Sequence, residues 1–559
     1  MNKNKKHSIV LGGLISSAGI FLSKVLGLVY VIPFNAIAGS ENMTYYGYAY
    51  NIYSYILNIF TAGIPFAIAT LVARYYEKED YKTMLLIKKI SLSLMMILGF
   101  LGMCFIIITS GPVSTMILAD GSGVETLEIT KNVLIIISFA LFFVPILAGY
   151  RGFYQGLKQM EIYAYSQVIE QFVRVFFLLG TGAIAVYIFK QEQIWAIYFA
   201  VFSATVAAIC ALIHIHKFDR KEMKKIKKLA KDQPMTFTKN KTNLLKEILI
   251  ISIPYLLSSI IAYSSDIVDL IFYSKALEST GIPADLCNYL YGTIIAVHTK
   301  KVIAIPQILA IGFGASMIPY ITSAIEKQNY EEVCKHIKDT LESVLYIALP
   351  LCLCLFFFSK EVMFLLYGNE EIVKVAGAGN SILTFNYLDY ANYMMKFRSL
   401  DALFGTIAPL FTSLLIASRL RKKSLVTLLV ASILKFIMVV PCTNFFGISG
   451  ATISNLFYYA MIICLDLYFL NKIFEINWTN TLKKIIIMLT GLLISTFVYF
   501  VLFMIFKDVT QLGRIGMLPI VLLEGTLVLF TYLMITGILG LPQKLFKHWL
   551  KDAILRLFL

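Results

Sequence analysis

The sequence is poor in charged residues. Of its 559 residues only 15% are Asp, Glu, Lys or Arg, whereas 58% are hydrophobic and the mean hydropathy is +0.77. A soluble globular protein is ordinarily about half apolar and about a quarter charged. The composition therefore excludes a soluble globular protein and indicates an integral membrane protein, because apolar runs of about 20 residues recur along the whole chain.

The sequence also lacks the motifs of several enzyme classes. It contains no HExxH, no GxSxG and no GxxxxGK[ST]. The glycine stretches GFGAS (312–316) and AGAGN (376–380) lack the strand-to-helix context of a nucleotide site. His214 and His216 have no further ligands nearby in the sequence, so we expect no metal and no cofactor.

Cysteine is too sparse for a disulfide framework. Most of the eight cysteines lie within apolar runs, where packing is their expected role. Cys287 and Cys442 lie toward the outer side of the predicted membrane and could pair, although nothing in the sequence requires it.

The apolar runs predict an all-α protein with about fourteen membrane-spanning helices. The spans lie near residues 8–38, 45–73, 86–110, 131–150, 164–189, 194–214, 247–273, 289–324, 339–358, 379–418, 424–441, 449–470, 485–506 and 516–540. The first is too long for a signal peptide, so we expect it to be retained. The 379–418 run exceeds one span, which predicts a kinked or broken helix there.

Lys and Arg set the orientation of these spans. Of the 49 Lys and Arg residues, 35 fall in segments on the side of the N-terminus, and the positive-inside rule places both termini in the cytoplasm of a multi-pass plasma-membrane protein. The net charge of +16 then serves topology and contact with anionic lipid headgroups rather than nucleic-acid binding.

Weak similarity between the two halves of the chain predicts its organisation. An Ile-Pro pair followed by a cytoplasmic helix occurs at 63–78 and again at 316–327. This supports two pseudo-symmetric six-helix lobes with a substrate site between them. The predicted parts are an N-terminal lobe (1–214), a basic cytoplasmic linker or surface helix (215–246), a C-terminal lobe (247–470), two further spans (471–540) and a cytoplasmic amphipathic tail (541–559).

Seven cations remain inside the predicted spans: Lys24, Arg174, Lys300, Lys301, Lys396, Arg398 and Lys435. A charge at the bilayer centre costs at least about 2.5–3.5 kcal/mol, so each should be paired, reach the interface or face a hydrated cavity. Arg174 follows Glu170 by four residues and can form a structural ion pair with it. Lys435 can extend to the interface.

The cations without an acidic neighbour in helical register are the candidates for an anion site. They are Lys24, Lys300 and Lys301. Glycine and proline within spans predict hinges at Pro33, Gly63 and Pro306. The alternative is that these residues are there because they allow close helix packing. Acidic residues in or near spans are candidates for binding Na⁺ or a proton: Asp266, Asp269, Asp389, Asp466 and Glu524.

Several stretches over most of the chain carry a family pattern. They include SKVLGLVYVIPFNAIAGS (23–40), GYRGFYQGLKQMEIYAYSQVIEQFVRV (149–175), YGTIIAVHTKKVIAIPQILAIGFGASMIPYITSAIEK (291–327) and GISGATISNLFYY (447–459). Together they resemble the Gram-positive polysaccharide-flippase branch of the multidrug/oligosaccharidyl-lipid/polysaccharide exporter superfamily. This branch contains MurJ-type lipid II flippases and relatives of stage V sporulation protein B.

The resemblance implies a two-lobed bundle of fourteen helices, not an enzyme. It would move an undecaprenyl-pyrophosphate-linked glycan, above all lipid II, to the outer leaflet by alternating access. It implies that Lys24 and Lys301 bind the pyrophosphate in a cationic cavity. From their chemistry alone, Asn58 and Tyr46 are candidates for hydrogen bonds to the sugar or for stacking on it, and packing or a place in the interface belt is the alternative role of each tyrosine. Arg151 and Lys158 are expected to be topology charges on a short cytoplasmic turn at Gly152 and Gly156.

Alternatives within and beyond this class stay open. The substrate could be another lipid-linked polysaccharide repeat, or the chain could be a sporulation-specific paralogue. A multidrug cation antiporter should have an acidic cavity, and a membrane glycosyltransferase or pyrophosphatase should have larger loops than the 111–130 loop, which has no His or Arg. Na⁺, H⁺ or the membrane potential would drive transport, and cell-wall synthesis proteins are candidate partners.

Overall fold

The computed structural model describes residues 26–545 except 28, 62, 158, 232–239, 308–320, 322–323, 326, 370, 377–380 and 419. Within this part of the chain, ten helical stretches are long and apolar enough to cross a membrane. The chain is therefore a multi-pass membrane protein, as its composition predicts. It divides into two compact units, unit 1 (Met1–Val297) and unit 2 (His298–Leu559).

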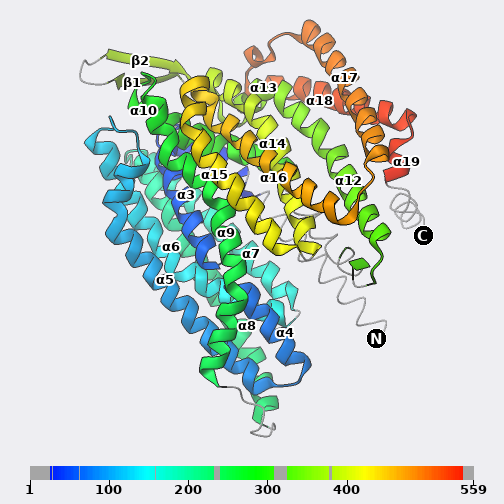
Figure 1. The fold of residues 1–559 in the computed structure, drawn as a ribbon. Helices are drawn as coiled ribbons and strands as arrows, with labels where there is room; N and C mark the ends of the chain where they lie inside the picture. Colours follow the sequence, from blue (N-terminus) through cyan, green and yellow to red (C-terminus); the bar gives the residue numbers. More distant parts are fainter. Residues whose placement is uncertain are drawn as a thin grey trace. The chain divides into compact units, whose positions relative to one another are not determined.

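Unit 1 is built from helices, several of them more than thirty residues long (Figure 1). In chain order they are α2 (Val31–Ala38), α3 (Met43–Thr61), α4 (Ile64–Glu77), α5 (Tyr81–Ile117), α6 (Val124–Gly156), α7 (Met160–Ala183), the π-helix η1 (Ile184–Ile188), α8 (Ile194–Lys231), α9 (Lys241–Glu278), α10 (Ala284–Tyr289) and the π-helix η3 (Leu290–Thr299), which reaches the boundary with unit 2.

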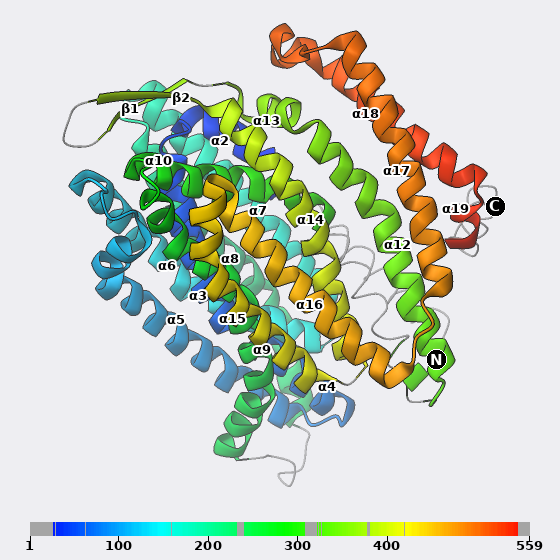
Figure 2. The same ribbon diagram turned by 45° about the horizontal axis from the view of Figure 1, so that its top comes forward.

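Unit 2 contains the remaining helices and one hairpin. The elements are α12 (Tyr330–Phe357), α13 (Ser359–Tyr367), β1 (Glu371–Ala376), β2 (Ser381–Asn386), α14 (Tyr387–Ala417), α15 (Arg421–Phe446), the 3-10 turn η5 (Gly447–Ser449), α16 (Gly450–Phe474), α17 (Thr479–Phe506), the 3-10 turn η6 (Val509–Leu512), α18 (Gly513–Ile538) and α19 (Leu541–Leu545). Helices α17 and α18 lie side by side in both ribbon views (Figure 2).

The number of spans depends on how α15 and α16 are counted. The stretch Arg421–Phe474 appears as a single apolar run because only the short turn η5 separates its two helices. Most of the predicted first span and part of the 289–324 span lie outside the described residues. The total of fourteen spans and the two pseudo-symmetric lobes therefore stay predictions.

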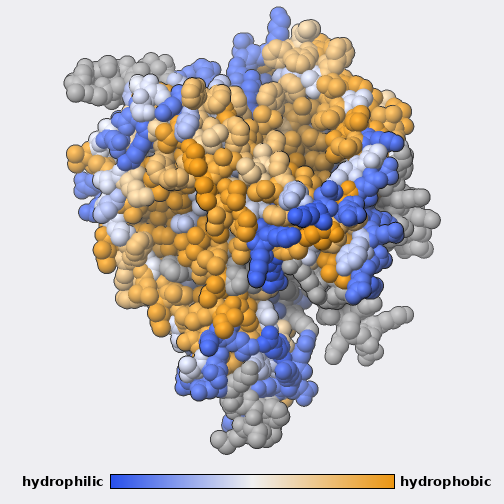
Figure 3. All heavy atoms as spheres, in the orientation of Figure 1, coloured by the Kyte–Doolittle hydropathy of each residue, from blue (hydrophilic) through white to orange (hydrophobic). Residues whose placement is uncertain are grey.

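The exterior of the described helices is apolar over long stretches. On α5, large hydrophobic side chains are exposed from Met96 to Ile108, and on α18 from Ile515 to Ile538. Figure 3 shows hydrophobic residues over much of the face drawn, with hydrophilic residues at its lower end, where α4 and α8 end and α9 begins, and in further patches at the upper left and on the right. Apolar side chains that would face water in a soluble protein face lipid here, which agrees with a membrane location.

Side-chain caps mark the start of two long helices. The Asp80 carboxylate accepts a hydrogen bond from the Thr83 backbone N–H at 2.9 Å where α5 begins. The Asn386 side chain accepts one from the Leu388 N–H at 3.0 Å where α14 begins. Such caps satisfy backbone donors that have no partner in the first helical turn.

The long 379–418 run is broken at this cap. Residues 381–386 form strand β2, which pairs antiparallel with β1 in the register Glu371 to Asn386, and α14 begins only at Tyr387. The predicted break is therefore confirmed, but it adds a hairpin to the otherwise helical architecture rather than a kink. The run appeared uniformly helical because a short apolar strand cannot be distinguished from helix by composition alone.

Helix α8 continues far beyond its predicted membrane span. It runs without interruption from Ile194 to Lys231, whereas the apolar segment was expected to end near 214. The first half of the predicted basic linker is therefore a helical extension of α8. Its apolar residues Ile215, Met223 and Ile226 are buried and join the core that packs α4, α5, α6, α8 and α9 together.

Glycines bring α6 and α4 into close contact. A Cβ on Gly152 would lie 2.6 Å from the Pro65 carbonyl oxygen, and one on Gly156 would lie 2.7 Å from that of Ala69. These two glycines lie within α6, so the predicted short turn is misplaced: the chain turns only between Gly156, where α6 ends, and Met160, where α7 begins. Small residues spaced by four are a common device for close packing of membrane helices.

We predict that Gly152→Ala destabilises the protein. The added methyl group has no room beside Pro65, and overpacking of this kind typically costs about 1–3 kcal/mol. Thermal unfolding of the purified protein should show a lower midpoint. The matched control is Gly180→Ala in α7, where an added Cβ meets no atom within 4 Å. Equal midpoints for the two variants would contradict the close packing of α6 on α4.

Candidate functional site

Three buried charges from α6 and α7 meet inside unit 1. One carboxylate oxygen of Glu170 lies 2.7 Å from a terminal nitrogen of Arg174, and the other lies 2.9 Å from a terminal nitrogen of Arg151. The side chains of Glu170, Arg174 and Arg151 are only 14%, 12% and 11% exposed. We call these three residues the arginine–glutamate cluster.

The Glu170–Arg174 contact follows from the four-residue spacing within α7. Arg151 comes from α6, where the sequence suggested an exposed topology charge, and that interpretation is wrong. Its Nε donates a hydrogen bond of 2.7 Å to the Ser166 hydroxyl of α7, in addition to the contact with Glu170. Arg151 therefore ties α6 to α7 through two polar contacts.

Tyrosines from α3 lie beside the cluster, and Tyr30, just before α2, contacts one of them. Tyr46, Tyr50 and Tyr53 lie close enough to Arg174 to interact with it electrostatically. The rings of Tyr46 and Tyr50 stack at 5.5 Å, and the hydroxyls of Tyr30 and Tyr46 are 2.9 Å apart. The cluster thus lies beside an aromatic wall that also carries hydroxyl groups.

The charges of the cluster do not cancel, since two guanidinium groups share one carboxylate. Within the described part of the chain, Nε of Arg174 has no hydrogen-bond acceptor. Guanidinium groups bind phosphate and carboxylate groups well because they offer several donors in a planar fork. The cluster can therefore hold an anion more readily than a cation.

The three lysines favoured from the sequence lie in different parts of the chain. Lys24 lies outside the described residues. Lys300 and Lys301 follow the π-helix η3 at the start of unit 2, and both are partly buried and have interaction partners. Their role in binding an anion stays a prediction.

Tyr46 and Asn58 of α3, the two residues predicted to contact the substrate, form hydrogen bonds to other groups of unit 1. Tyr46 is 3% exposed and is hydrogen-bonded to Tyr30. The Asn58 side-chain amide donates to the Ser54 carbonyl at 2.7 Å, which satisfies one of its donors on its own helix. A substrate contact by Tyr46 would require Tyr46 to become accessible.

The predicted hinges lie in different environments. The Pro33 ring is exposed within α2, whereas Pro306 is buried in the helical segment 300–307. Gly63 separates α3 from α4, and a Cβ there would lie 2.4 Å from the Ser252 carbonyl oxygen. Close packing on α9 explains this glycine without movement, and hinge motion at the three positions stays a prediction.

A second buried ion pair was missed by the sequence analysis. Lys88 of α5 pairs with Asp219 of α8, and the Tyr154 hydroxyl donates to the same Asp219 oxygen at 2.6 Å. Lys88 lies at the cytoplasmic end of the predicted 86–110 span, and Asp219 lies in the predicted basic linker or surface helix. The available signal was the spacing of Asp219 from Ile215 and Met223, which places the carboxylate on the apolar face of α8.

Unit 2 contains buried charges of its own. Asp466 is fully buried; one of its carboxylate oxygens accepts from the Thr412 hydroxyl at 3.0 Å, and the other has no partner among the described residues. Lys435 is also fully buried and donates to Ser454 at 2.6 Å, so the prediction that it extends to the interface is wrong. Arg398 pairs with Asp401 at 2.6 Å.

The other acidic candidates are distributed over both units. Asp269 and Glu524 are buried, Asp266 is partly buried and Asp389 is exposed. No group of three or more His, Cys, Asp or Glu residues suited to a metal ion occurs where the structure is described. All eight cysteines are unpaired.

Sequence comparison relates the chain to a polysaccharide biosynthesis family and to a lipid II flippase. The family model described as "Polysaccharide biosynthesis protein" matches residues 9–324. The lipid II flippase MurJ of Bacillus subtilis (strain 168) is 26% identical over 486 residues, which cover 86% of each chain.

Solved structures show the same fold. The inward closed conformation of a lipid II flippase MurJ superposes with a TM-score of 0.67 at 15% identity, covering 94% of this chain and 98% of that one. An inward-facing multidrug resistance MATE family transporter gives a TM-score of 0.63 at 13% identity, covering 81% and 94%. These findings confirm the resemblance to the exporter superfamily, and the similar proteins are flippases and transporters rather than enzymes.

We predict that Glu170→Gln destabilises unit 1 strongly. The change leaves Arg151 and Arg174 facing each other without an anion, and removing one member of a buried ion pair typically costs about 3–5 kcal/mol. Asp120→Asn is the matched control because the Asp120 side chain is 75% exposed in its pair with Lys275, and such pairs contribute about 0–1 kcal/mol. Thermal unfolding midpoints that fall equally in both variants would contradict a central role for Glu170.

Proposed function

Because the chain belongs to the polysaccharide biosynthesis protein family, we propose that it is a flippase for an undecaprenyl-pyrophosphate-linked glycan. The substrate that we favour is the peptidoglycan precursor lipid II, which would move from the inner to the outer leaflet. The observation that carries the proposal is the similarity to a lipid II flippase over most of both chains.

The chemistry of such a substrate sets the requirements for the protein. A pyrophosphate and a hydrophilic glycan must cross hydrocarbon, whereas the prenyl chain can stay in it. The path must therefore offer cations for the phosphates and hydroxyl or aromatic groups for the sugars. The arginine–glutamate cluster and the neighbouring tyrosines supply both kinds of group in unit 1.

The proposed division of roles starts from the predicted lysines. Lys24 and Lys301 bind the pyrophosphate, with Lys300 beside Lys301, because a lysine ammonium suits a phosphate as a point charge. The arginine–glutamate cluster keeps the interior of unit 1 positive while Glu170 prevents the two guanidinium groups from repelling each other. Asn58 and Tyr46 contact the sugar in a conformation in which they are accessible.

Transport proceeds by alternating access between the two predicted lobes, with both termini in the cytoplasm. Bending at Pro33, Gly63 and Pro306 accompanies the change. Asp466 is the acidic residue that we favour for coupling to Na⁺ or a proton, because it is fully buried and one of its oxygens has no partner among the described residues. Cell-wall synthesis proteins that use the flipped lipid are the proposed partners.

A different lipid-linked polysaccharide repeat is the second candidate substrate. The family description names polysaccharide biosynthesis in general, and the proposed pyrophosphate site does not depend on the sugar. A flippase with a sporulation-specific role is a further form of this second candidate. A multidrug cation antiporter is disfavoured, because the arginine–glutamate cluster carries more positive than negative charge.

We predict that Lys301→Ala impairs flipping. Loss of a charged hydrogen bond to phosphate, worth about 1.5–3 kcal/mol, should reduce the rate about tenfold or more. The measurement is the amount of lipid II accessible from outside cells that lack their other lipid II flippases. Lys335→Ala, at an exposed position of α12, is the matched control.

The same assay tests the proposed substrate. Depletion of the wild-type protein should lower the external lipid II, and Lys335→Ala should restore it. If depletion leaves external lipid II unchanged while another undecaprenyl-linked glycan disappears from the surface, the second candidate replaces lipid II. If no lipid-linked glycan changes, the proposed function is wrong.

A further inference from the structure

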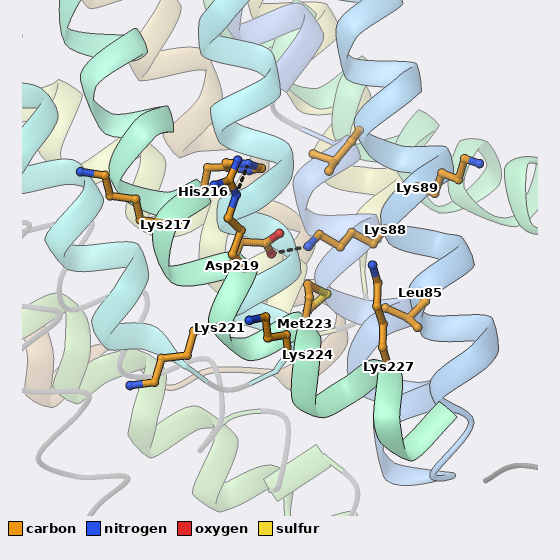
Figure 4. Close-up of a pocket in the computed structure, with 12 residues that line it drawn as sticks. Leu85, Lys88, Lys89, His216, Lys217, Asp219, Lys221, Met223, Lys224 and Lys227 are labelled. Carbon is orange, nitrogen blue, oxygen red and sulfur yellow. Dashed lines mark hydrogen bonds and ion pairs between the residues drawn. The ribbon is translucent and has the colours of Figure 1, made fainter. Parts of the chain in front are cut away.

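A strongly basic pocket lies between α5 and the extension of α8 (Figure 4). Its volume is about 870 Å³, within the usual range of ligand sites. Seven of its twelve lining residues are Lys or Arg: Lys88 and Lys89 come from α5, and the other five come from α8 between positions 217 and 227. Asp219 is the acidic residue among them.

The sequence of α8 separates two faces of the helix. Ile215, Asp219, Met223, Ile226 and Ala230 are buried, with the three- and four-residue spacing of one helical face. The cations at 217, 220, 221, 224 and 227 follow a similar spacing beside this face, and all five are exposed. Together with Lys225, Lys228 and Lys231 they make up the exposed side of the helix, away from the buried face.

The one carboxylate of the pocket is already engaged. Asp219 accepts hydrogen bonds from the Lys88 ammonium and, at 2.6 Å, from the Tyr154 hydroxyl. Lys88 is 8% exposed and its Nζ lies 4.9 Å from the centre of the Phe153 ring. Figure 4 shows Lys88 and Asp219 pointing toward each other across the gap between α5 and α8. The Lys88–Asp219 pair lies at the buried side of the pocket, and it does not neutralise the remaining cations.

The remaining cations have no anionic partner in the described part of the chain. Lys89, Lys217, Lys221, Lys224 and Lys227 make no ion pair there. Arg220 donates a 3.2 Å hydrogen bond from its Nε to Nε2 of His216, which is uncharged when it accepts.

A bound anion would relieve the repulsion within this group. Like charges three or four residues apart destabilise a helix. The helix dipole favours cations only in the last turn, which contains Lys228 and Lys231 rather than the pocket residues. An anion placed between α5 and α8 would contact several of the cations at once.

The pocket lies near the edge of the apolar surface of unit 1. On α5, the exposed hydrophobic residues begin at Met96, about 10 Å along the helix from Lys89. On α8, Ile213 is 52% exposed and the cations begin one turn later. Leu85, Leu92 and Met223 give the pocket an apolar side. A ligand with a phosphate group and an apolar remainder matches this combination.

We propose that this basic pocket binds the phosphate headgroup of an anionic phospholipid at the membrane surface. The exposed α8 cations contact the phosphate oxygens, and the Lys88–Asp219 pair holds α8 at the correct distance from α5. Lipid bound in this way joins two helices of unit 1 and stabilises the extension of α8. A free phosphate compound shares the chemistry of the headgroup but lacks the apolar part.

The test compares two triple variants with the same loss of charge. Arg220→Gln, Lys224→Gln and Lys227→Gln together remove cations that line the pocket. Lys225→Gln, Lys228→Gln and Lys231→Gln together remove three cations of the same helix that do not line it. The full-length protein is purified in detergent, and binding of dioctanoyl phosphatidylglycerol, dioctanoyl phosphatidylcholine and inorganic pyrophosphate is measured by native mass spectrometry.

The wild-type protein should bind phosphatidylglycerol about tenfold more tightly than phosphatidylcholine. The pocket variant should lose about tenfold of that affinity, whereas the control variant should lose less than about threefold. An equal loss in both variants would show that only the overall surface charge matters and would overturn the proposal. Binding of pyrophosphate without binding of phosphatidylglycerol would also overturn it, in favour of a soluble ligand. Thermal unfolding of both variants shows whether each is folded.

Discussion

A charge inside a membrane protein must find an opposite charge, hydrogen-bonding partners or water, and Glu170 meets this requirement for two arginines. The position of Arg151 on α6 and of Arg174 on α7 makes the carboxylate a link between helices as well as a neutralising group. Close packing of α6 on α4 at Gly152 then sets where Arg151 lies. The arginine–glutamate cluster therefore depends on the Glu170 carboxylate and on Gly152, the small residue next to Arg151 in sequence.

Much of the fold could be predicted because long apolar helices appear in the sequence as long apolar runs. Caps and breaks were harder to predict, since they depend on a few residues. Asn386 caps α14 and ends the apolar run that begins near 379, but a strand and a helix of similar hydropathy look alike there. The extension of α8 to Lys231 was hidden because its charged residues resemble a solvated linker unless the buried face is examined.

The candidate site was predictable only where its members share a helix. Glu170 and Arg174 are four residues apart on α7, so their contact follows from helical geometry. Arg151 and Asp219 each find their partner on another helix, and no spacing within one sequence reveals such a pair. The positive-inside count even worked against Arg151, because it assigns any cation near a helix end to the surface.

The central claim is that this chain moves a lipid-linked glycan across the membrane. The most direct measurement uses purified wild-type protein in proteoliposomes that contain a fluorescent lipid II, with a membrane-impermeant reductant added outside. Our account predicts that the fluorescence lost to the reductant exceeds the value for protein-free liposomes, and that the excess falls in the Lys301→Ala protein. The same loss with and without wild-type protein, under an imposed membrane potential and Na⁺ or proton gradients, would contradict it.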